Sequence, residues 1–325
     1  MKRRPALLAL CAALAAGAWA QVAPIPARVA ILGVEPADSP IARRLLAGIR
    51  EGLAGEGLAE GRDFAIEYLA EARIDRVPAK VEALVRRRPA LIVPITTPVA
   101  QAAASAARGI PIVFGTVSDP VGSGLVASLA RPGGNVTGVS NMLPALSGKL
   151  LELAGELVPG VSRVAVLWNP ANPAKAIELW ELRAAAAARG IALEELPART
   201  PQEIERALAP GARDGARLLV ILAETLTHAH RGRIAELAQA RRLVVVSSLS
   251  THTEAGGVLS SQPGYAALNR RVGALAGKIL KGMSPAELPV ELPATFELLV
   301  NRKAAQALGL TLPQSLLIRA DRVIE

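Results

Sequence analysis

Polar motifs directly follow apolar runs in this sequence, at points where a strand would end and a helix begin. Thr97-Pro98 follows the run Ala90–Ile95, and Ser118-Asp119 follows the run Ile112–Phe114. A helix start presents free N–H groups and the positive end of its dipole to an anion. The carboxylate of Asp119 instead suits an ammonium group. We therefore predict a polar site with a positive and a negative pole.

The second half of the chain carries comparable residues. Asn169 and Glu224 each follow a short apolar run, and Ser247 and Ser248 close another. Glu224 occupies the place that matches the Thr-Pro motif of the first half, and we expect it to add a second acidic group. Trp168 could stack on a ligand ring, but alternation along its strand favours a place in the core.

Each of these residues also has a plain structural interpretation. Thr97 could be a helix N-cap followed by Pro98 at the first helical position, and such a cap leaves other N–H groups for a ligand. For Asp119 the two interpretations compete, because capping the next helix would occupy one carboxylate oxygen. Ser247 and Ser248 equally fit a simple turn between a strand and a helix.

Apolar runs of strand length alternate with longer stretches of helical spacing, which is the pattern of βαβ units and a parallel sheet. Apolar stripes at Ile41–Leu53 and Leu268–Ile279 indicate helices. Strands are expected at Arg28–Val34, Phe64–Tyr68, Ala90–Ile95, Ile112–Phe114, Val136–Val139, Arg163–Leu167, Leu218–Leu222 and Leu243–Ser247. The predicted fold class is therefore α/β.

Parts of this pattern occur twice at nearly the same separation: Arg28–Leu32 recurs as Arg163–Leu167, and Gly109–Asp119 resembles Ala240–Ser250. The duplication predicts two similar doubly wound, Rossmann-like lobes with parallel sheets around a ligand cleft. We expect residues 27–138 plus 260–289 in the N-terminal lobe and 139–259 plus 290–325 in the C-terminal lobe. A hinge is expected at Val136–Val139, Leu259–Gln262 and Pro289–Pro293.

Several classes of function find no support. Cys11 is the single cysteine, and His228 and His230 would point to different sides of a helix, so no metal or other cofactor is predicted. The Gly-x-Gly-x-x-Gly, P-loop and Gly-x-Ser-x-Gly motifs are absent, so no enzymatic activity is predicted. The net charge is +9, but the arginine runs lie apart without interleaved aromatic residues, so we expect no nucleic-acid partner.

The N-terminus has the pattern of a secretory signal peptide. Positive Lys2–Arg4 precede the apolar stretch Ala6–Gly17, and Ala18–Ala20 place small residues where signal peptidase reads them. We expect a signal peptide at residues 1–20, cleaved after Ala20, and a cysteine-free mature chain in the periplasm. Lipidation at Cys11 is the disfavoured alternative, because the preceding Leu10 is large.

Longer stretches resemble a known family. Ile110–Ser140, Lys278–Pro285 and Leu308–Leu317 are similar to ABC-transporter substrate-binding proteins that include the tryptophan/tyrosine binders, and the resemblance covers nearly the whole mature chain. It implies a type I periplasmic-binding fold that captures a small solute by hinge closure and delivers it to an ABC permease in the inner membrane. Family members often carry Asp where Glu224 stands.

The resemblance does not identify the solute, but an amino acid or a related compound fits the two predicted poles. We expect the protein to act as a monomer. The alternative is a periplasmic sensor component that presents a bound solute to a signalling receptor, since the same cleft would serve both functions.

Overall fold

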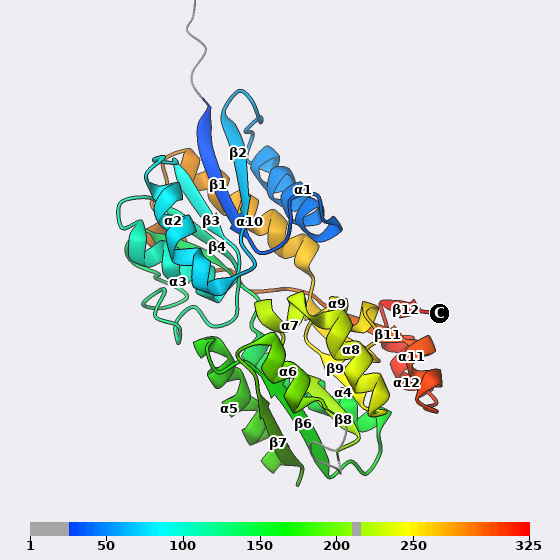
Figure 1. Cartoon of the computed structure of the whole chain (residues 1–325). Coiled ribbons are helices and arrows are strands. Elements are labelled where there is room, and N and C mark those ends of the chain that lie inside the picture. Colours follow the sequence, from blue (N-terminus) through cyan, green and yellow to red (C-terminus); the bar gives the residue numbers. More distant parts are fainter. Residues whose placement is uncertain (1–25, 210–215) are drawn as a thin grey trace, which may run out of the picture.

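The computed structural model describes residues 26–209 and 216–325, which form two α/β lobes connected by several passages of the chain (Figure 1). The predicted signal peptide lies outside the described residues. No helix in the described ranges is both long and apolar enough to cross a membrane.

The first lobe is built around a five-stranded sheet in the order β2-β1-β3-β4-β5. All of its strand pairs are parallel. Its elements up to the first crossing are β1 (Ala27–Gly33), α1 (Pro40–Gly55), β2 (Phe64–Ala70), the 3-10 turn η1 (Ile74–Arg76), α2 (Val77–Val85), β3 (Leu91–Pro94), α3 (Thr97–Ala106), β4 (Ile112–Val117) and β5 (Val136–Ser140).

The second lobe contains a seven-stranded sheet in the order β12-β11-β10-β9-β8-β6-β7, in which only the β10–β11 pair of the described strands is antiparallel. The chain enters it through α4 (Leu143–Leu157), β6 (Arg163–Trp168), α5 (Pro173–Ala187), β7 (Ala192–Pro197), α6 (Pro201–Ala207), β8 (Leu218–Ile221), α7 (Thr225–Ala229), α8 (Arg231–Ala240), β9 (Val244–Ser247), α9 (Ser250–Glu254) and β10 (Leu259–Pro263).

The chain then returns to the first lobe as α10 (Tyr265–Leu280) and afterwards completes the second lobe. The remaining elements are η2 (Pro285–Glu287), β11 (Phe296–Asn301), α11 (Arg302–Ala307), α12 (Gln314–Arg319) and β12 (Arg322–Ile324). The crossings touch one another, because Ser140 N donates to Glu291 O and Thr137 Oγ1 donates to Leu288 O.

The predicted duplication and fold class are confirmed. In each lobe the first five strands follow the same order, with β6, β7, β8, β9 and β10 in the places of β1 to β5. The lobe boundaries remain a prediction, to which the strand pairing adds two details. β5 extends to Ser140 within the first sheet, and β10 pairs within the second sheet.

Two predicted elements differ from the structure. No helix follows Asp119, because residues 119–132 form turns and irregular chain before β5. The helix expected around His228 and His230 is divided at His230 into α7 and α8. The sequence prediction also did not recognise four strands of the second sheet: β7 and β12 at its edges, and the adjacent strands β10 and β11.

Helix α10 packs closely along α1, as the two apolar stripes predict. The predicted stripe residues Leu45, Ile49, Leu268 and Val272 are buried in one core cluster with the strands of the first sheet. Glycines allow the close approach: a Cβ at Gly52 would lie 2.0 Å from Arg270 O, and one at Gly273 would lie 2.1 Å from Ile49 O.

Candidate functional site

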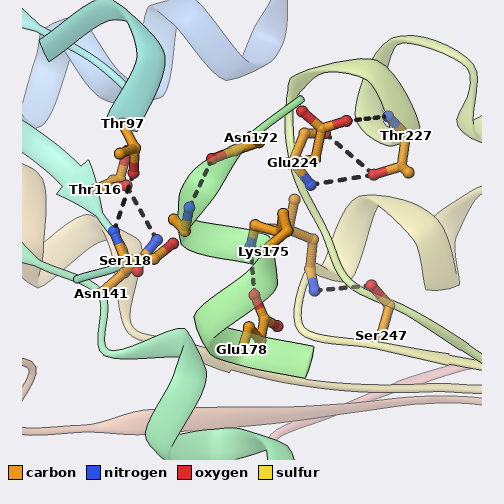
Figure 2. Close-up of polar contacts among 12 residues, drawn as sticks. Thr97, Thr116, Ser118, Asn141, Asn172, Lys175, Glu178, Glu224, Thr227 and Ser247 are labelled. Carbon is orange, nitrogen blue, oxygen red and sulfur yellow. Dashed lines mark hydrogen bonds and ion pairs between the residues drawn. The ribbon is translucent and has the colours of Figure 1, made fainter. Parts of the chain in front are cut away.

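A cleft of about 240 Å³ lies where the carboxyl ends of the two sheets face each other. Residues from both lobes line it, as expected for parallel sheets, whose ligands bind beyond the carboxyl ends of the strands. Its polar lining residues include Glu35, Tyr68, Thr96, Thr97, Thr116, Ser118, Asn141, Lys175, Glu224, Thr225, His228 and Thr251. Figure 2 shows part of this lining from both lobes.

Two threonines at the first-lobe edge have left-handed backbone conformations. Thr96, just after β3, has φ +82° and ψ 154°, and Thr116, near the end of β4, has φ +54°. Such conformations are unfavourable for β-branched residues and cluster at functional sites, where the surrounding structure enforces them. Both threonines line the cleft, so the strain is stored at the predicted ligand edge.

The α3 helix begins at this edge. Thr96 occupies the N-cap position without a side-chain cap, and Thr97 and Pro98 are its first two residues. Thr97 is 3% exposed, and its Oγ1 accepts a hydrogen bond from Ser118 N at 3.4 Å. Because no side chain caps α3, its first N–H groups are available to a ligand, which fits the predicted positive pole.

Glu224 places a carboxylate in the opposite wall. It is the N-cap of α7 and forms a capping box with Thr227. Its Oε1 accepts from Leu226 N at 2.9 Å and Thr227 N at 3.3 Å, and Asn169 Nδ2 donates to it at 3.4 Å. Burial raises the pKa of Glu224, although the charge of Lys175 and these hydrogen bonds act in the opposite direction.

Among the described residues, four buried polar atoms in the cleft lining have no hydrogen-bond partner: Thr96 Oγ1, Asn141 Oδ1, Glu224 Oε2 and Thr225 Oγ1. An unpaired buried polar atom costs free energy, so such a group indicates a partner that arrives from outside. A carboxylate oxygen only accepts hydrogen bonds. An ionised Glu224 therefore presents one free acceptor oxygen to the cleft, and an ammonium group is one donor that would suit it.

Lys175 contributes a positive charge next to Glu224. It lies in the first turn of α5, is 1% exposed, and forms a buried ion pair with Glu178 one helical turn away. Buried ion pairs of this kind hold their side chains in place, because removing one partner would leave an unpaired charge. Lys175 is thus held by Glu178, and Glu224 Oε2 stays without a partner.

A further polar contact joins the lobes at the cleft. His228 Nε2 lies 2.6 Å from Glu35 Oε1, and His228 Nδ1 lies 3.0 Å from Thr251 Oγ1. Glu35 follows β1 in the first lobe, whereas His228 and Thr251 lie in α7 and α9 of the second. Burial lowers the pKa of His228, although the neighbouring Glu35 carboxylate opposes this effect.

Three of the residues predicted from the sequence line the cleft: Thr97, Ser118 and Glu224. Pro98 lies in α3 behind Thr97. The carboxylate of Asp119 accepts from Gly122 N at 2.8 Å and is not part of the cleft lining, so it holds a turn of the loop. Its role as the amine pole remains a prediction, and the geometry favours Glu224 for that role.

The other predicted residues lie just behind the lining. Asn169 is buried, and its Oδ1 accepts from Ala171 N at 2.9 Å while its amide supports Glu224. Ser247 Oγ lies 2.9 Å from His252 Nδ1, and Ser248 is buried beside it. Trp168 packs against the core of the second lobe, in line with the interpretation that the sequence favoured.

Several lining residues did not stand out in the sequence. Asn141 and Lys175 lie in or near helix starts, and Glu35 lies in a loop whose partner is distant along the chain. His228 was considered only as a metal ligand. No group of three or more metal-ligating side chains occurs within residues 26–209 and 216–325. Glu224 was predicted because its position in the second half of the chain matches Thr97 in the first half. The contact between Glu35 and His228 joins two lobes and leaves no such pattern in the sequence.

The two lobes and the cleft define a ligand-binding protein of the type I periplasmic-binding class. The family described as "ABC transporter substrate binding protein" matches residues 29–324. The chain therefore belongs to the ABC-transporter substrate-binding protein family.

Individual relatives agree with this assignment. A tyrosine-binding protein of Clostridioides difficile is 27% identical over 81% of this chain and 76% of its own length. The ABC domain of a Streptococcus pneumoniae protein in complex with L-Trp is 28% identical, covers 92% of this chain and 100% of its own, and gives a TM-score of 0.85. A ligand-free, open substrate-binding protein of Clostridium difficile is 25% identical over 92% of this chain and 99% of its own, with a TM-score of 0.68.

Proposed function

We propose that this chain is the periplasmic solute-binding component of an ABC import system and that it captures an amino acid or a related amine in the cleft. The observation that carries the proposal is the buried Oε2 of Glu224, which lines the cleft and has no partner among the described residues. Membership of a substrate-binding family supports capture of a solute, and the signal-peptide pattern of residues 1–20 supports export.

The two poles come from different lobes. The ammonium group of the solute would pair with Glu224 in the second lobe, and its carboxylate would accept hydrogen bonds from the start of α3 near Thr97 and Ser118 in the first. A solute that carries both groups would therefore favour the arrangement in which the lobes are close. Binding of this kind involves no bond making, so we expect the solute to leave unchanged.

Two of these relatives suggest the first probes. One relative is described as tyrosine-binding and another was determined with L-Trp. Apolar side chains such as Ile41, Leu45 and Ile95 also line the cleft and can receive the hydrophobic part of such a solute. We therefore propose aromatic amino acids as the first solutes to test.

The direct experiment identifies the solute without assuming it. The exported protein is purified, its intact mass is checked for a chain that starts at Gln21, and the solute released by denaturation is analysed by mass spectrometry. We expect an amine-carboxylate. Recovery of a sugar or a purely anionic solute instead would contradict the proposal.

Analogues of one probe test each pole separately. Isothermal titration calorimetry compares L-Trp with tryptamine, which lacks the carboxylate, and with indole-3-propionate, which lacks the amine. Both analogues should bind at least about tenfold more weakly than L-Trp, because each leaves one pole of the cleft unpaired. Equal binding of indole-3-propionate would show that Glu224 does not receive an ammonium group.

The import role has its own test. A strain that lacks this chain should take up the identified, isotope-labelled solute more slowly, and a plasmid copy should restore uptake. Unchanged uptake together with tight binding would favour a sensor function.

A further inference from the structure

The two lobes contact each other at one end of the cleft through Glu35 and His228. Their side chains are 16% and 11% exposed, and His228 Nε2 lies 2.6 Å from Glu35 Oε1. Because a carboxylate only accepts, the proton of a neutral His228 lies on Nε2. His228 Nδ1 then accepts from the Thr251 hydroxyl at 3.0 Å, so each polar atom of the ring has a partner that suits it.

Both partners are held in place from their own lobe. In the first lobe the Tyr68 hydroxyl donates to the backbone oxygen of Glu35 at 2.7 Å. In the second lobe Arg231 Nη1 donates to His228 O at 2.7 Å and lies 4.0 Å from Glu35 Oε1. A charge-assisted hydrogen bond between groups that are fixed in advance and largely shielded from water is stronger than an exposed pair.

This contact lies next to the proposed poles, at the side of the cleft formed by β1 and β2. In the first sheet β2 and β1, which carry Tyr68 and lead to Glu35, are at the opposite edge from β5, which leads to Asn141. The start of α3 lies between them, after β3. Glu35 and His228 therefore join the lobes at the end of the cleft that is remote from Asn141. His228 lies one helical turn from Glu224, because its N–H donates to Glu224 O at 2.9 Å, so a measurement without solute is required to separate the contact between lobes from contacts with a solute.

The lobe arrangement is that of a closed form. At comparable identity and equal coverage of this chain, the TM-score is 0.85 to the L-Trp complex and 0.68 to the open, ligand-free structure. The hydrogen bond between Glu35 and His228 spans the two lobes, so it exists only when they are close.

We propose that Glu35 and His228 form an interlobe clasp that stabilises the closed arrangement and slows the release of the bound solute. The effect on release rests on the proposed function, whereas the effect on the lobe arrangement does not. The clasp is a property of the protein alone, so it acts before any solute binds.

The first arm of the test needs no solute. The mature chain contains no cysteine, so Arg86→Cys in the first lobe and Gln239→Cys in the second allow two spin labels to be attached at exposed positions. Pulsed electron paramagnetic resonance then measures the distance between the lobes. We expect Glu35→Ala and His228→Ala to shift the distribution to longer distances, and His228→Gln, which keeps a donor near the position of Nε2, to restore it in part.

The matched control is Glu60→Ala. It removes a carboxylate that is paired with Arg50 at 2.7 Å within the first lobe, so the lobe distance should not change. Distances in Glu35→Ala and His228→Ala that equal those of the unsubstituted labelled protein would overturn the clasp. An equal shift in Glu60→Ala would do the same, because the effect would then not depend on the contact between lobes.

The second arm measures release by stopped-flow displacement, with L-Trp as the probe. Glu35→Ala and His228→Ala should each increase the release rate about tenfold, with a smaller change in the association rate. The double variant should release no faster than Glu35→Ala, because Glu35→Ala already removes the hydrogen bond to His228 as well as the weaker ion pair with Arg231. Faster release without a change in ligand-free distance would overturn the clasp and make Glu35 a solute contact.

The two arms separate the clasp from the proposed function. If L-Trp does not bind, the distance measurement still decides whether the clasp exists, and the proposed solute class alone is affected.

Discussion

At the scale of single residues, Glu224 combines a structural role with the binding role that we propose for its second carboxylate oxygen. Its Oε1 caps α7 and receives the Asn169 amide, while Oε2 is buried without a partner. The cap fixes the direction of the carboxylate, so the second oxygen is already oriented when a solute arrives. Such preorganisation reduces the entropic cost of binding.

The raised pKa of Glu224 predicts a pH-dependent affinity. Burial is its main cause, so this carboxyl takes up a proton at a higher pH than an exposed glutamate. A protonated Glu224 has no charge for an ammonium group, so L-Trp should bind progressively more weakly as the pH falls through that raised pKa. Calorimetric titration at a series of pH values measures this change.

Glu224→Gln is the matching variant. It should weaken L-Trp binding at neutral pH roughly 10- to 150-fold, because a charge-assisted hydrogen bond is lost, and its affinity should vary less with pH. Asp119→Asn, whose carboxylate holds a loop turn outside the cleft, should have a smaller effect. If Asp119→Asn weakened L-Trp binding more than Glu224→Gln, Asp119 would be the group that pairs with the ammonium of the solute.

Thr96 offers a second test at this scale, because its backbone conformation is one that mainly glycine adopts. Thr96→Gly should raise the free energy of unfolding by about 1 kcal/mol, because it removes the strain of a β-branched side chain there. The same change removes Oγ1 from the cleft, so solute binding should weaken. Urea unfolding and calorimetry measure the two effects. A less stable Thr96→Gly protein would show that the threonine side chain supports the fold.

At the scale of elements, α10 connects the lobes structurally, since it follows a strand of the second sheet and packs on α1 of the first. The contact depends on small residues at the crossing. Gly52 and Gly273 face each other's helix backbone, and a Cβ at either position would overlap it. Close helix contact at this point holds Tyr265 and Asn269, both near the start of α10, in the cleft wall.

Gly52→Ala should therefore destabilise the first lobe. Its Cβ would approach Arg270 O to 2.0 Å, and separating two packed helices typically costs about 1–3 kcal/mol. Gly55→Ala is the control, because it lies in the last turn of the same helix with no atom within 4 Å of the added Cβ. Urea unfolding should show a lower midpoint for the first variant only. Equal urea midpoints for the two variants would mean that α1 and α10 can accommodate the added Cβ at Gly52 without loss of stability.

Elements with a strong apolar pattern were predictable from the sequence, and contacts between them were not. The buried central strands and the stripes of α1 and α10 follow directly from residue spacing, and the repeat led to Glu224 and Thr97 as matching positions. Asp119 was placed before a helix that does not form, because a strand end followed by Asp-Pro resembles a helix start. His228 and Glu35 meet only through the arrangement of the lobes, and no local pattern reports such a contact.

At the scale of the whole molecule, the crossings between lobes touch one another near Ser140 and Glu291. Hydrogen bonds between these segments keep the lobes connected along one side, while the cleft lies between the carboxyl ends of the two sheets. Rotation about this side would separate Glu224 from the start of α3 and break the contact between Glu35 and His228. On the proposed function, a solute with two opposite charges would bind both lobes and shift the equilibrium toward the closed arrangement.

Small-angle X-ray scattering tests this closure. Saturating solute, first L-Trp, should reduce the radius of gyration, because it selects closed molecules from a mixture of open and closed ones. Glu35→Ala should show the larger reduction, since its ligand-free form would contain more open molecules. Glu224→Gln at the same solute concentration should remain near its ligand-free value, because little solute is bound. A radius that stays constant in the unsubstituted protein and in Glu35→Ala, under conditions where calorimetry shows saturation, would exclude closure around the solute and leave a rigid cleft.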